Sequence, residues 1–112
     1  MTLEEKEKQI INYYGVLAQL KYFQSEVFEL NEAILYREHP NDIVRPFRDM
    51  SANLHGGVSP DIEHIAEEIA DVQLMLNQFK EYYSISNITI DRIMNEKANR
   101  QLERIANENN PR

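Results

Sequence analysis

The chain contains no cysteine, only three glycines and four prolines, and no long apolar run. The absence of cysteine excludes a disulfide framework, a thiolate metal site and a cysteine nucleophile. No apolar stretch approaches the roughly 20 residues that a membrane-spanning helix requires, and the N-terminal segment Met-Thr-Leu-Glu-Glu-Lys-Glu-Lys lacks the apolar core of a signal peptide. We therefore expect a soluble, cytoplasmic protein.

Positive charge is also scarce, because 12 Lys and Arg residues stand against 19 Asp and Glu residues and leave a net charge of −7. This balance argues against nucleic acid and against anionic membranes as partners, and an anionic ligand would need an intervening metal ion. A length of 112 residues with a hydrophobic share of 42% fits a single domain. We assign that domain to residues 1–106 and expect a frayed tail at 107–112.

Apolar residues recur every three or four positions in two long segments, which is the period of an amphipathic helix. The pattern predicts an all-α antiparallel helical bundle of three long helices, at about 3–37, 60–83 and 89–106, completed by oligomerisation because its own core is thin. The apolar stripe of the first helix consists of Ile10, Tyr13, Val16, Leu20, Phe23, Val27, Leu30 and Ile34. The stripe of the second consists of Ile62, Ile65, Ile69, Val72, Leu76, Phe79 and Tyr83.

Local signals indicate where the first helix begins and ends. Thr2 and Glu5 have the spacing of a capping box, in which each residue satisfies a free amide of the other. No proline interrupts the chain before Pro40, although Gly15 would soften the helix. The sequence therefore predicts one long first helix.

The remaining boundaries follow from proline, serine and asparagine. A long loop is expected at 38–59, with a short helix at 41–50 that Pro46 limits. Ser59 followed by proline is a typical helix start, so the second helix should begin there. Asn87 or Thr89 would cap the third helix.

Two pairs of acids interrupt the apolar segments: Glu26 with Glu29, and Glu68 with Asp71. Residues three apart share a helix face, so the carboxylates of each pair repel unless a cation lies between them. Each acid comes one residue before a stripe position in both helices, and equal offsets bring the pairs together only if the two helices are antiparallel. A cluster of this kind offers only oxygen ligands, which suits Mg²⁺, or Mn²⁺, better than zinc or copper.

A single acid pair at helical spacing is common on a solvated face, so the prediction depends on the two pairs taken together. Glu67 either faces solvent or supplies a further ligand. His64 lies one turn before Glu68 and is either a surface residue near a helix start or a neighbour of the metal ligands.

The third helix carries a row that changes from apolar to basic. Ile90 and Ile93 are followed at the same spacing by Lys97, Arg100 and Arg104, whose cations suit phosphate oxygens. Alternatively, the helix leaves the bundle and its basic residues complement the C-terminal end of the helix dipole. In that case its apolar side is formed by Met94, Ala98, Leu102 and Ile105.

Three stretches, Tyr14 to Leu20, Glu26 to Ile34 and Ile65 to Val72, resemble the MazG-like nucleoside triphosphate pyrophosphohydrolases of the all-α NTP pyrophosphatase superfamily. The signature of that family is Glu-Glu-x-x-Glu followed by Glu-x-x-Asp, and the resemblance spans residues 13–104. It implies metal-dependent hydrolysis of (deoxy)nucleoside triphosphates to monophosphate and pyrophosphate, in a homodimer or a dimer-of-dimers tetramer. It also implies Mg²⁺ ligands at Glu26, Glu29, Glu68 and Asp71, and phosphate-binding residues at Lys97, Arg100 and Arg104.

The chain departs from the family pattern at two places. Ser25 stands where the family usually has its first glutamate, and the segment between the two motifs is longer than usual. The alternative is therefore a helical dimer with little or no turnover that acts as a nucleotide- or metal-binding or interaction module. Tyr13, Tyr14, Phe47 and the amide of Gln19 are candidates for binding the nucleobase, and equally for packing.

Two other nucleotide or metal enzyme classes are disfavoured. A carboxylate-bridged di-iron bundle needs Glu-x-x-His on two helices, and the nearest match is Asp61-Ile62-Glu63-His64. A P-loop enzyme needs Lys-Ser or Lys-Thr after its glycines, and Gly56-Gly57 is not followed by either.

Overall fold

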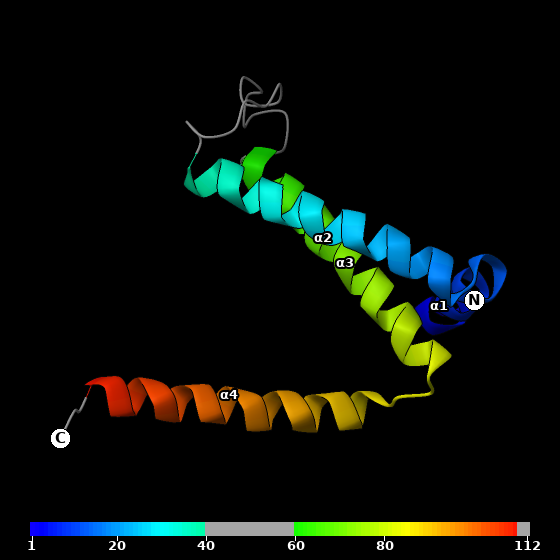
Figure 1. Ribbon diagram of the computed structural model, residues 1–112. Coiled ribbons are helices and arrows are strands. Elements are labelled where there is room, and N and C mark those ends of the chain that lie inside the picture. Colours follow the sequence, from blue (N-terminus) through cyan, green and yellow to red (C-terminus); the bar gives the residue numbers. More distant parts are fainter. Residues whose placement is uncertain (40–59, 110–112) are drawn as a thin grey trace. The chain divides into compact units, whose positions relative to one another are not determined.

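The computed structural model describes residues 1–39 and 60–109, and these form helices and short connections without a strand. The helices are α1 (Leu3–Tyr14), α2 (Val16–Glu38), α3 (Pro60–Tyr82) and α4 (Asn87–Asn109) (Figure 1). The all-α prediction is confirmed. The predicted short helix at 41–50 and most of the predicted loop lie outside the described residues.

The chain divides into two compact units, Met1–Tyr82 with α1, α2 and α3, and Tyr83–Arg112 with α4. The assignment of residues 1–106 to a single domain stays a prediction. None of the helices in the described part of the chain is long and apolar enough to cross a membrane.

Helix α1 begins with the predicted capping box. The hydroxyl of Thr2 accepts from the backbone N–H of Glu5 at 3.1 Å, and the Glu5 carboxylate accepts from the N–H of Thr2 at 3.3 Å. The helix ends at Gly15, whose φ of 89° and ψ of 153° are accessible essentially to glycine alone. The predicted single helix at 3–37 is therefore two helices, because this backbone conformation stops one ladder of hydrogen bonds and starts another.

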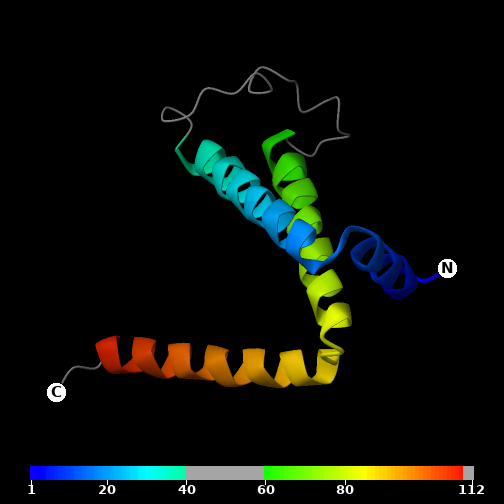
Figure 2. The ribbon, with the colours of Figure 1, turned by 45° about the vertical axis from the view of Figure 1, so that its right-hand side comes forward.

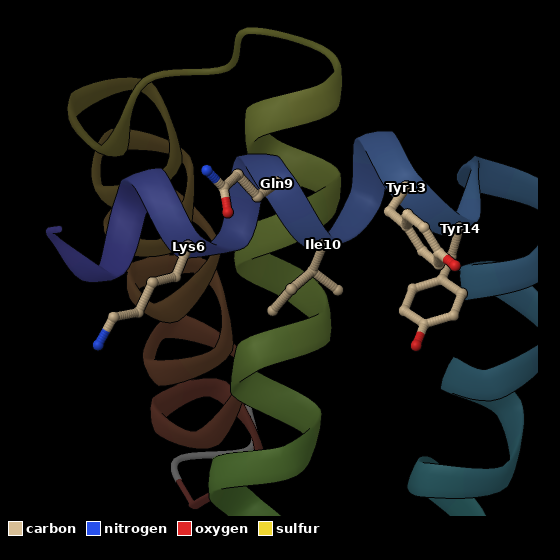
Figure 3. Close-up of a pocket in the computed structure, with 5 residues that line it drawn as sticks. All are labelled: Lys6, Gln9, Ile10, Tyr13 and Tyr14. Atoms are coloured by element: carbon tan, nitrogen blue, oxygen red, sulfur yellow. The ribbon is translucent and has the colours of Figure 1, made fainter.

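One face of α1 packs on α3, while another stays open. Ile11 is only 1% exposed, and Lys8 lies 3.9 Å from Glu81 of α3. The open face is a hollow lined by Lys6, Gln9, Ile10, Tyr13 and Tyr14 (Figure 3). The two tyrosine rings meet edge to face, with centroids 4.9 Å apart, at the C-terminal end of the helix.

Helices α2 and α3 lie side by side and run in opposite directions (Figures 1 and 2). The antiparallel arrangement that the acid pairs require is therefore present. The rings of Phe23 and Phe79 meet edge to face across this contact, with centroids 5.5 Å apart. Ala33, Tyr36 and Met75 complete the buried apolar part of the unit between these helices.

Part of each predicted apolar stripe is exposed, and the buried face of each helix is shifted by one residue from that part. Seven-residue steps bury Gln19, Glu26 and Ala33 on α2, and Glu68 and Met75 on α3. Six stripe residues instead form a row that is 40–50% exposed, and we call it the outer apolar row: Leu20, Val27, Ile34, Ile62, Ile69 and Leu76.

Helix α4 forms the second unit, and none of its side chains is buried along its described length. Its first turn is capped by Ser86, whose hydroxyl accepts from the N–H of Thr89 at 3.1 Å. The predicted caps, Asn87 and Thr89, are therefore inside the helix, and the helix continues to Asn109 rather than ending at 106. Ion pairing of Arg92 with Glu96 at 3.2 Å, four residues apart, supports the exposed helix.

Candidate metal centre

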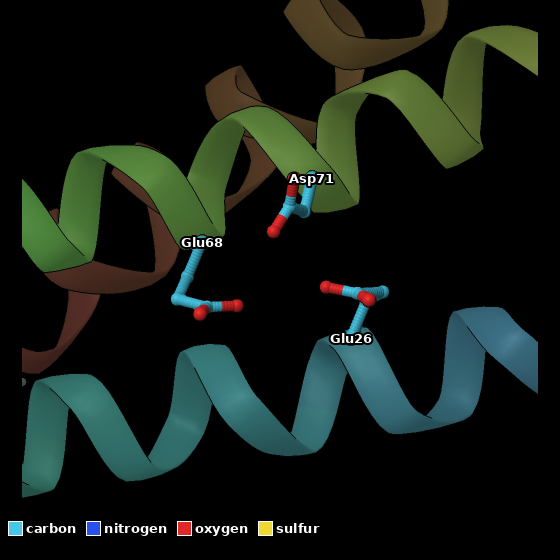
Figure 4. Close-up of side chains that lie close together, drawn as sticks. All are labelled: Glu26, Glu68 and Asp71. Carbon is cyan, nitrogen blue, oxygen red and sulfur yellow. The ribbon is translucent and has the colours of Figure 1, made fainter.

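Three of the four predicted acids converge between α2 and α3. Glu26 extends from α2 toward Glu68 and Asp71 of α3 (Figure 4). One carboxylate oxygen from each residue lies within 4.8 Å of the others. The convergence follows from the antiparallel packing, because it places two segments of opposite direction face to face with their acids in register.

Two of these carboxylates are removed from solvent. Glu26 is 6% exposed and Glu68 is 7% exposed, and each has one buried oxygen, Oε2, without a hydrogen-bond partner among the described residues. A buried carboxylate oxygen without a partner is destabilising, because it loses its water and gains nothing in return. A cation bound to these carboxylates would supply the missing interactions and stabilise the folded protein.

The electrostatics of the cluster favour protonation in the absence of a cation. Burial, followed by the negative charges of Glu29, Asp71 and Glu26, raises the pKa of Glu68 from 4.5 to about 7. Burial and the charges of Asp71 and Glu29 also raise the pKa of Glu26. Repulsion between the carboxylates favours their protonated forms, and a bound divalent cation would relieve the same repulsion.

Glu29, the fourth predicted acid, lies beside the cluster rather than within it. Its side chain is exposed, and it is outside the set of three carboxylates that lie within 4.8 Å of one another. Its charge is nevertheless the second largest cause of the raised pKa of Glu68, after burial. Glu29 therefore adds negative charge at the edge of the cluster.

Two further side chains approach the cluster. The imidazole Nε2 of His64 is 3.8 Å from Oε1 of Glu68, one helical turn away. Tyr22, one turn before Glu26, has its pKa raised by the charge of that carboxylate and by a hydrogen bond to it. His64 was one of the neighbours that the sequence suggested, whereas Tyr22 was not predicted, because a tyrosine beside an apolar stripe resembles a packing residue.

Five other positions that the sequence singled out lie on exposed surfaces. Ser25 and Glu67 are exposed on α2 and α3, and neither belongs to the set of three converging carboxylates. Lys97, Arg100 and Arg104 line a hollow of about 190 Å³ on α4, together with Gln101. The three cations thus share one face of their helix, as their spacing predicts.

The donor set fits a hard divalent cation. Carboxylate oxygens alone suit Mg²⁺ and Mn²⁺, and a site with three carboxylates leaves coordination positions for water or phosphate oxygens. The two buried oxygens without partners supply the structural reason for a cation here.

A second polar feature between the same helices was missed as a pair. The side-chain amide of Gln19 on α2 donates to Oε1 of Gln78 on α3 at 2.8 Å, and both residues are buried. The signal lies in the spacing, because Gln19 precedes Glu26 by seven residues and Gln78 follows Asp71 by seven. Seven residues are two helical turns, so the glutamines lie on the same faces as the acids.

No protein-family model, no curated protein and no solved structure matches this chain.

Proposed function

We propose that this protein is a metal-dependent pyrophosphohydrolase of the MazG-like kind, which converts (deoxy)nucleoside triphosphates to monophosphate and pyrophosphate. The observation that carries the proposal is the cluster of Glu26, Glu68 and Asp71, whose two buried members each have an oxygen without a partner among the described residues. The resemblance of the two acid motifs to that family supplies the reaction.

The charge of the chain supports a metal-bridged, phosphate-rich substrate. A net charge of −7 repels a free polyphosphate. A cation held by acids reverses that sign locally, so an acidic cleft can accept an anion. A carboxylate cluster that holds a cation therefore favours an anionic ligand such as a nucleotide over a neutral one.

Glu26, Glu68 and Asp71 would hold Mg²⁺, or Mn²⁺, with Glu29 as the fourth proposed ligand. When bound, the cation would neutralise phosphate charge and lower the pKa of the attacking water. Glu68 must lose its proton before its carboxylate can bind the cation, and with a pKa of about 7 it is only partly ionised near neutral pH. Cation binding therefore releases protons.

The proposed chemistry needs no covalent intermediate. Water attacks the α-phosphorus, the bond from that phosphorus to the bridging oxygen breaks, and pyrophosphate leaves with the bridging oxygen. The oxygen of the water remains on the monophosphate. Lys97, Arg100 and Arg104 are proposed to bind phosphate, because three cations on one helix face are suited to a polyanion.

We further propose a homodimer or a dimer of dimers. The support is the outer apolar row, six aliphatic side chains that remain 40–50% exposed on α2 and α3. Exposed aliphatic side chains that recur along a helix pair are typical of a protein interface, and a second copy of the same row is a self-complementary partner for it.

The test is pyrophosphate release from a panel of ribo- and deoxynucleoside triphosphates in millimolar Mg²⁺ or Mn²⁺. Glu68→Gln and Asp71→Asn should each lower the rate on the order of a hundredfold or more, since each removes a charge from the metal ligands. Glu67→Gln is the matched control, because Glu67 is exposed on the same helix. Absence of release from every substrate, or equal rates in all variants, would contradict the proposal.

The alternative is a module that binds metal and nucleotide without turnover. Ser25, at the position of the family's first glutamate, favours it by removing one acidic side chain. This alternative predicts stabilisation by Mg²⁺ that depends on Glu68, with no pyrophosphate release from the wild type.

A further inference from the structure

Gln19 and Gln78 form a buried pair between α2 and α3, and some of their amide donors and acceptors make no hydrogen bond to the described residues. Gln19 is 8% exposed and Gln78 is 1% exposed. Gln19 donates to Gln78 at 2.8 Å, and the amide of Gln78 donates to the sulfur of Met75 at 3.7 Å, a weak contact. Within the described residues, Oε1 of Gln19 accepts no hydrogen bond, so the pair retains both an acceptor and amide hydrogens.

A cavity of about 470 Å³ adjoins this pair. The two glutamines line it together with Tyr14, Tyr22, Leu74 and Met75. This volume lies within the roughly 300–1,000 Å³ that is common for small-molecule pockets, and the composition is also typical of them, with apolar and aromatic walls around a few polar groups. A flat aromatic ligand with a hydrogen-bonding edge suits such walls, because tyrosine rings stack on it and the amides reach its edge.

The cavity lies at a short distance from the proposed metal centre. Tyr22 lines the cavity and lies one helical turn before Glu26, whose charge raises the pKa of the tyrosine, so the same side chain adjoins both sites. The glutamines lie two turns along each helix from Glu26 and Asp71, which is about 10 Å at the rise of an α-helix. The sugar and the base of a nucleotide together span a distance of this order, from the α-phosphate to the Watson–Crick edge of the base.

We propose that this cavity binds the base of the nucleotide and that Gln19 and Gln78 hydrogen-bond to its Watson–Crick edge. The proposal rests on the proposed function, since it assigns the base of the same substrate. Every nucleobase presents donors or acceptors on that edge, and a pair of amides offers both. Rotation of the two amides by 180° exchanges donor for acceptor, so the pair adapts to more than one base.

A purely structural role is the competing explanation. A buried polar pair can serve to set the register of two helices, without any ligand. The two roles predict different effects on ligand binding when both residues are replaced by leucine. Replacing both partners of a buried hydrogen bond with apolar groups of the same shape can leave stability nearly unchanged or raise it. Leucine is close to glutamine in size, so we expect the double variant to fold.

The experiment is a titration of the labelled full chain with unphosphorylated nucleosides, followed by NMR. The probes are adenosine, guanosine, cytidine, uridine and thymidine, and the signals are the side-chain amides of Gln19 and Gln78 and the methyl group of Met75. At least one nucleoside should shift these signals saturably. Gln19→Leu combined with Gln78→Leu should weaken its binding by about tenfold or more, with an unchanged or higher melting temperature.

Two further variants keep the test decisive. Gln24→Leu is the matched control, because Gln24 is exposed on α2 and outside the cavity, and it should bind as the wild type does. Ala18→Leu fills the cavity without altering the glutamine pair, so it should block binding even if the double variant misfolds. The proposal is overturned if no nucleoside shifts the three signals, or if the folded double variant or Ala18→Leu binds as tightly as the wild type.

This experiment separates the cavity from the metal centre, because nucleosides need neither metal nor turnover. Saturable nucleoside binding without pyrophosphate release would contradict the proposed hydrolysis and would support the proposed binding of a base in the cavity. In an active enzyme, inhibition by inorganic tripolyphosphate, which has no base, should be the same in the double variant and the wild type. If the protein releases pyrophosphate and the nucleotide KM is the same in the double variant as in the wild type, the proposed role of the cavity is wrong and the proposed hydrolysis still stands.

Discussion

Replacing Glu68 with glutamine is expected to stabilise the metal-free protein at neutral pH and to destabilise it, relative to the wild type, when Mg²⁺ is present. Glu68 is 7% exposed, and one of its oxygens has no partner among the described residues. Glutamine has nearly the shape of the protonated acid but never carries its charge. The substitution therefore removes the repulsion and the ability to bind a cation at the same time.

The size of the effect follows from the pKa of Glu68, which burial and neighbouring acids raise from 4.5 to about 7. Because the folded state holds this proton more tightly, the stabilisation is fully present below about pH 4.5 and is lost as the pH rises through about 7. Each pH unit in that window lowers the free energy of unfolding by about 1.4 kcal/mol, so the wild type loses at most about 3 kcal/mol. The glutamine variant should not show this loss.

A cation reverses the order of the two proteins. Binding to the folded state alone stabilises it by RT ln(1 + [L]/Kd), about 2.7 kcal/mol at a concentration of one hundred times Kd. The wild type should gain this stabilisation and the glutamine variant should gain little. The expected signature is a crossover, with the variant more stable in EDTA and less stable in millimolar MgCl₂.

Urea unfolding followed by the circular dichroism of the helices measures both effects, at a series of pH values between about 5 and 8. Glu67→Gln should behave as the wild type at every pH and metal concentration, because Glu67 is exposed. A wild-type stability that is flat across the pH series, or a glutamine variant that is less stable in EDTA, would refute the reasoning.

Three further predictions concern the fold and its assembly. Gly15→Ala should lower the free energy of unfolding by about 1–3 kcal/mol through backbone strain alone, since nothing lies within 4 Å of the added Cβ; Ser84→Gly, at a φ of 56°, should be tolerated in the same urea assay. Thr2→Ala should remove the capping box and lower the stability of α1 by about 1 kcal/mol. Hydrogen exchange should then be faster in α1 but not in α4. Ile69→Lys should shift the protein toward monomer in light scattering without loss of helical signal, and an unchanged mass would argue against an interface at the outer apolar row.

Much of the helical structure could be predicted because its signals are local. The capping box at Thr2, the proline at the start of α3 and the three-four apolar period all act within one or two turns. The break at Gly15 was harder to predict, because an isolated glycine is tolerated inside a helix and only its positive φ shows that the helix stops. In addition, α1 packs on α3, which lies far along the chain, and a local pattern does not predict such a contact.

The candidate site was only partly predictable. Glu26, Glu68 and Asp71 could be brought together from their spacing and an antiparallel packing, because both are geometric properties of helices. The places of Glu29 and Tyr22 could not, since they depend on how far each helix is rotated about its own axis. Rotation is set by packing across the interface, and the sequence of one helix does not determine it.

The rotation itself follows from two demands on the same surfaces. A helix pair that maximised apolar burial would turn Leu20, Val27 and Ile69 inward and leave the acids outside, yet these three residues are 40–50% exposed while Glu26 and Glu68 are buried. Burying carboxylates in place of aliphatic side chains lowers stability, so such a packing is expected where the acids have a function. The same rotation leaves an aliphatic row at the surface, where a second copy would recover the apolar burial that a single chain gives up. The proposed metal centre inside the helix pair and the proposed interface outside it would thus be two consequences of one rotation. A substitution that turned the outer apolar row inward should abolish both.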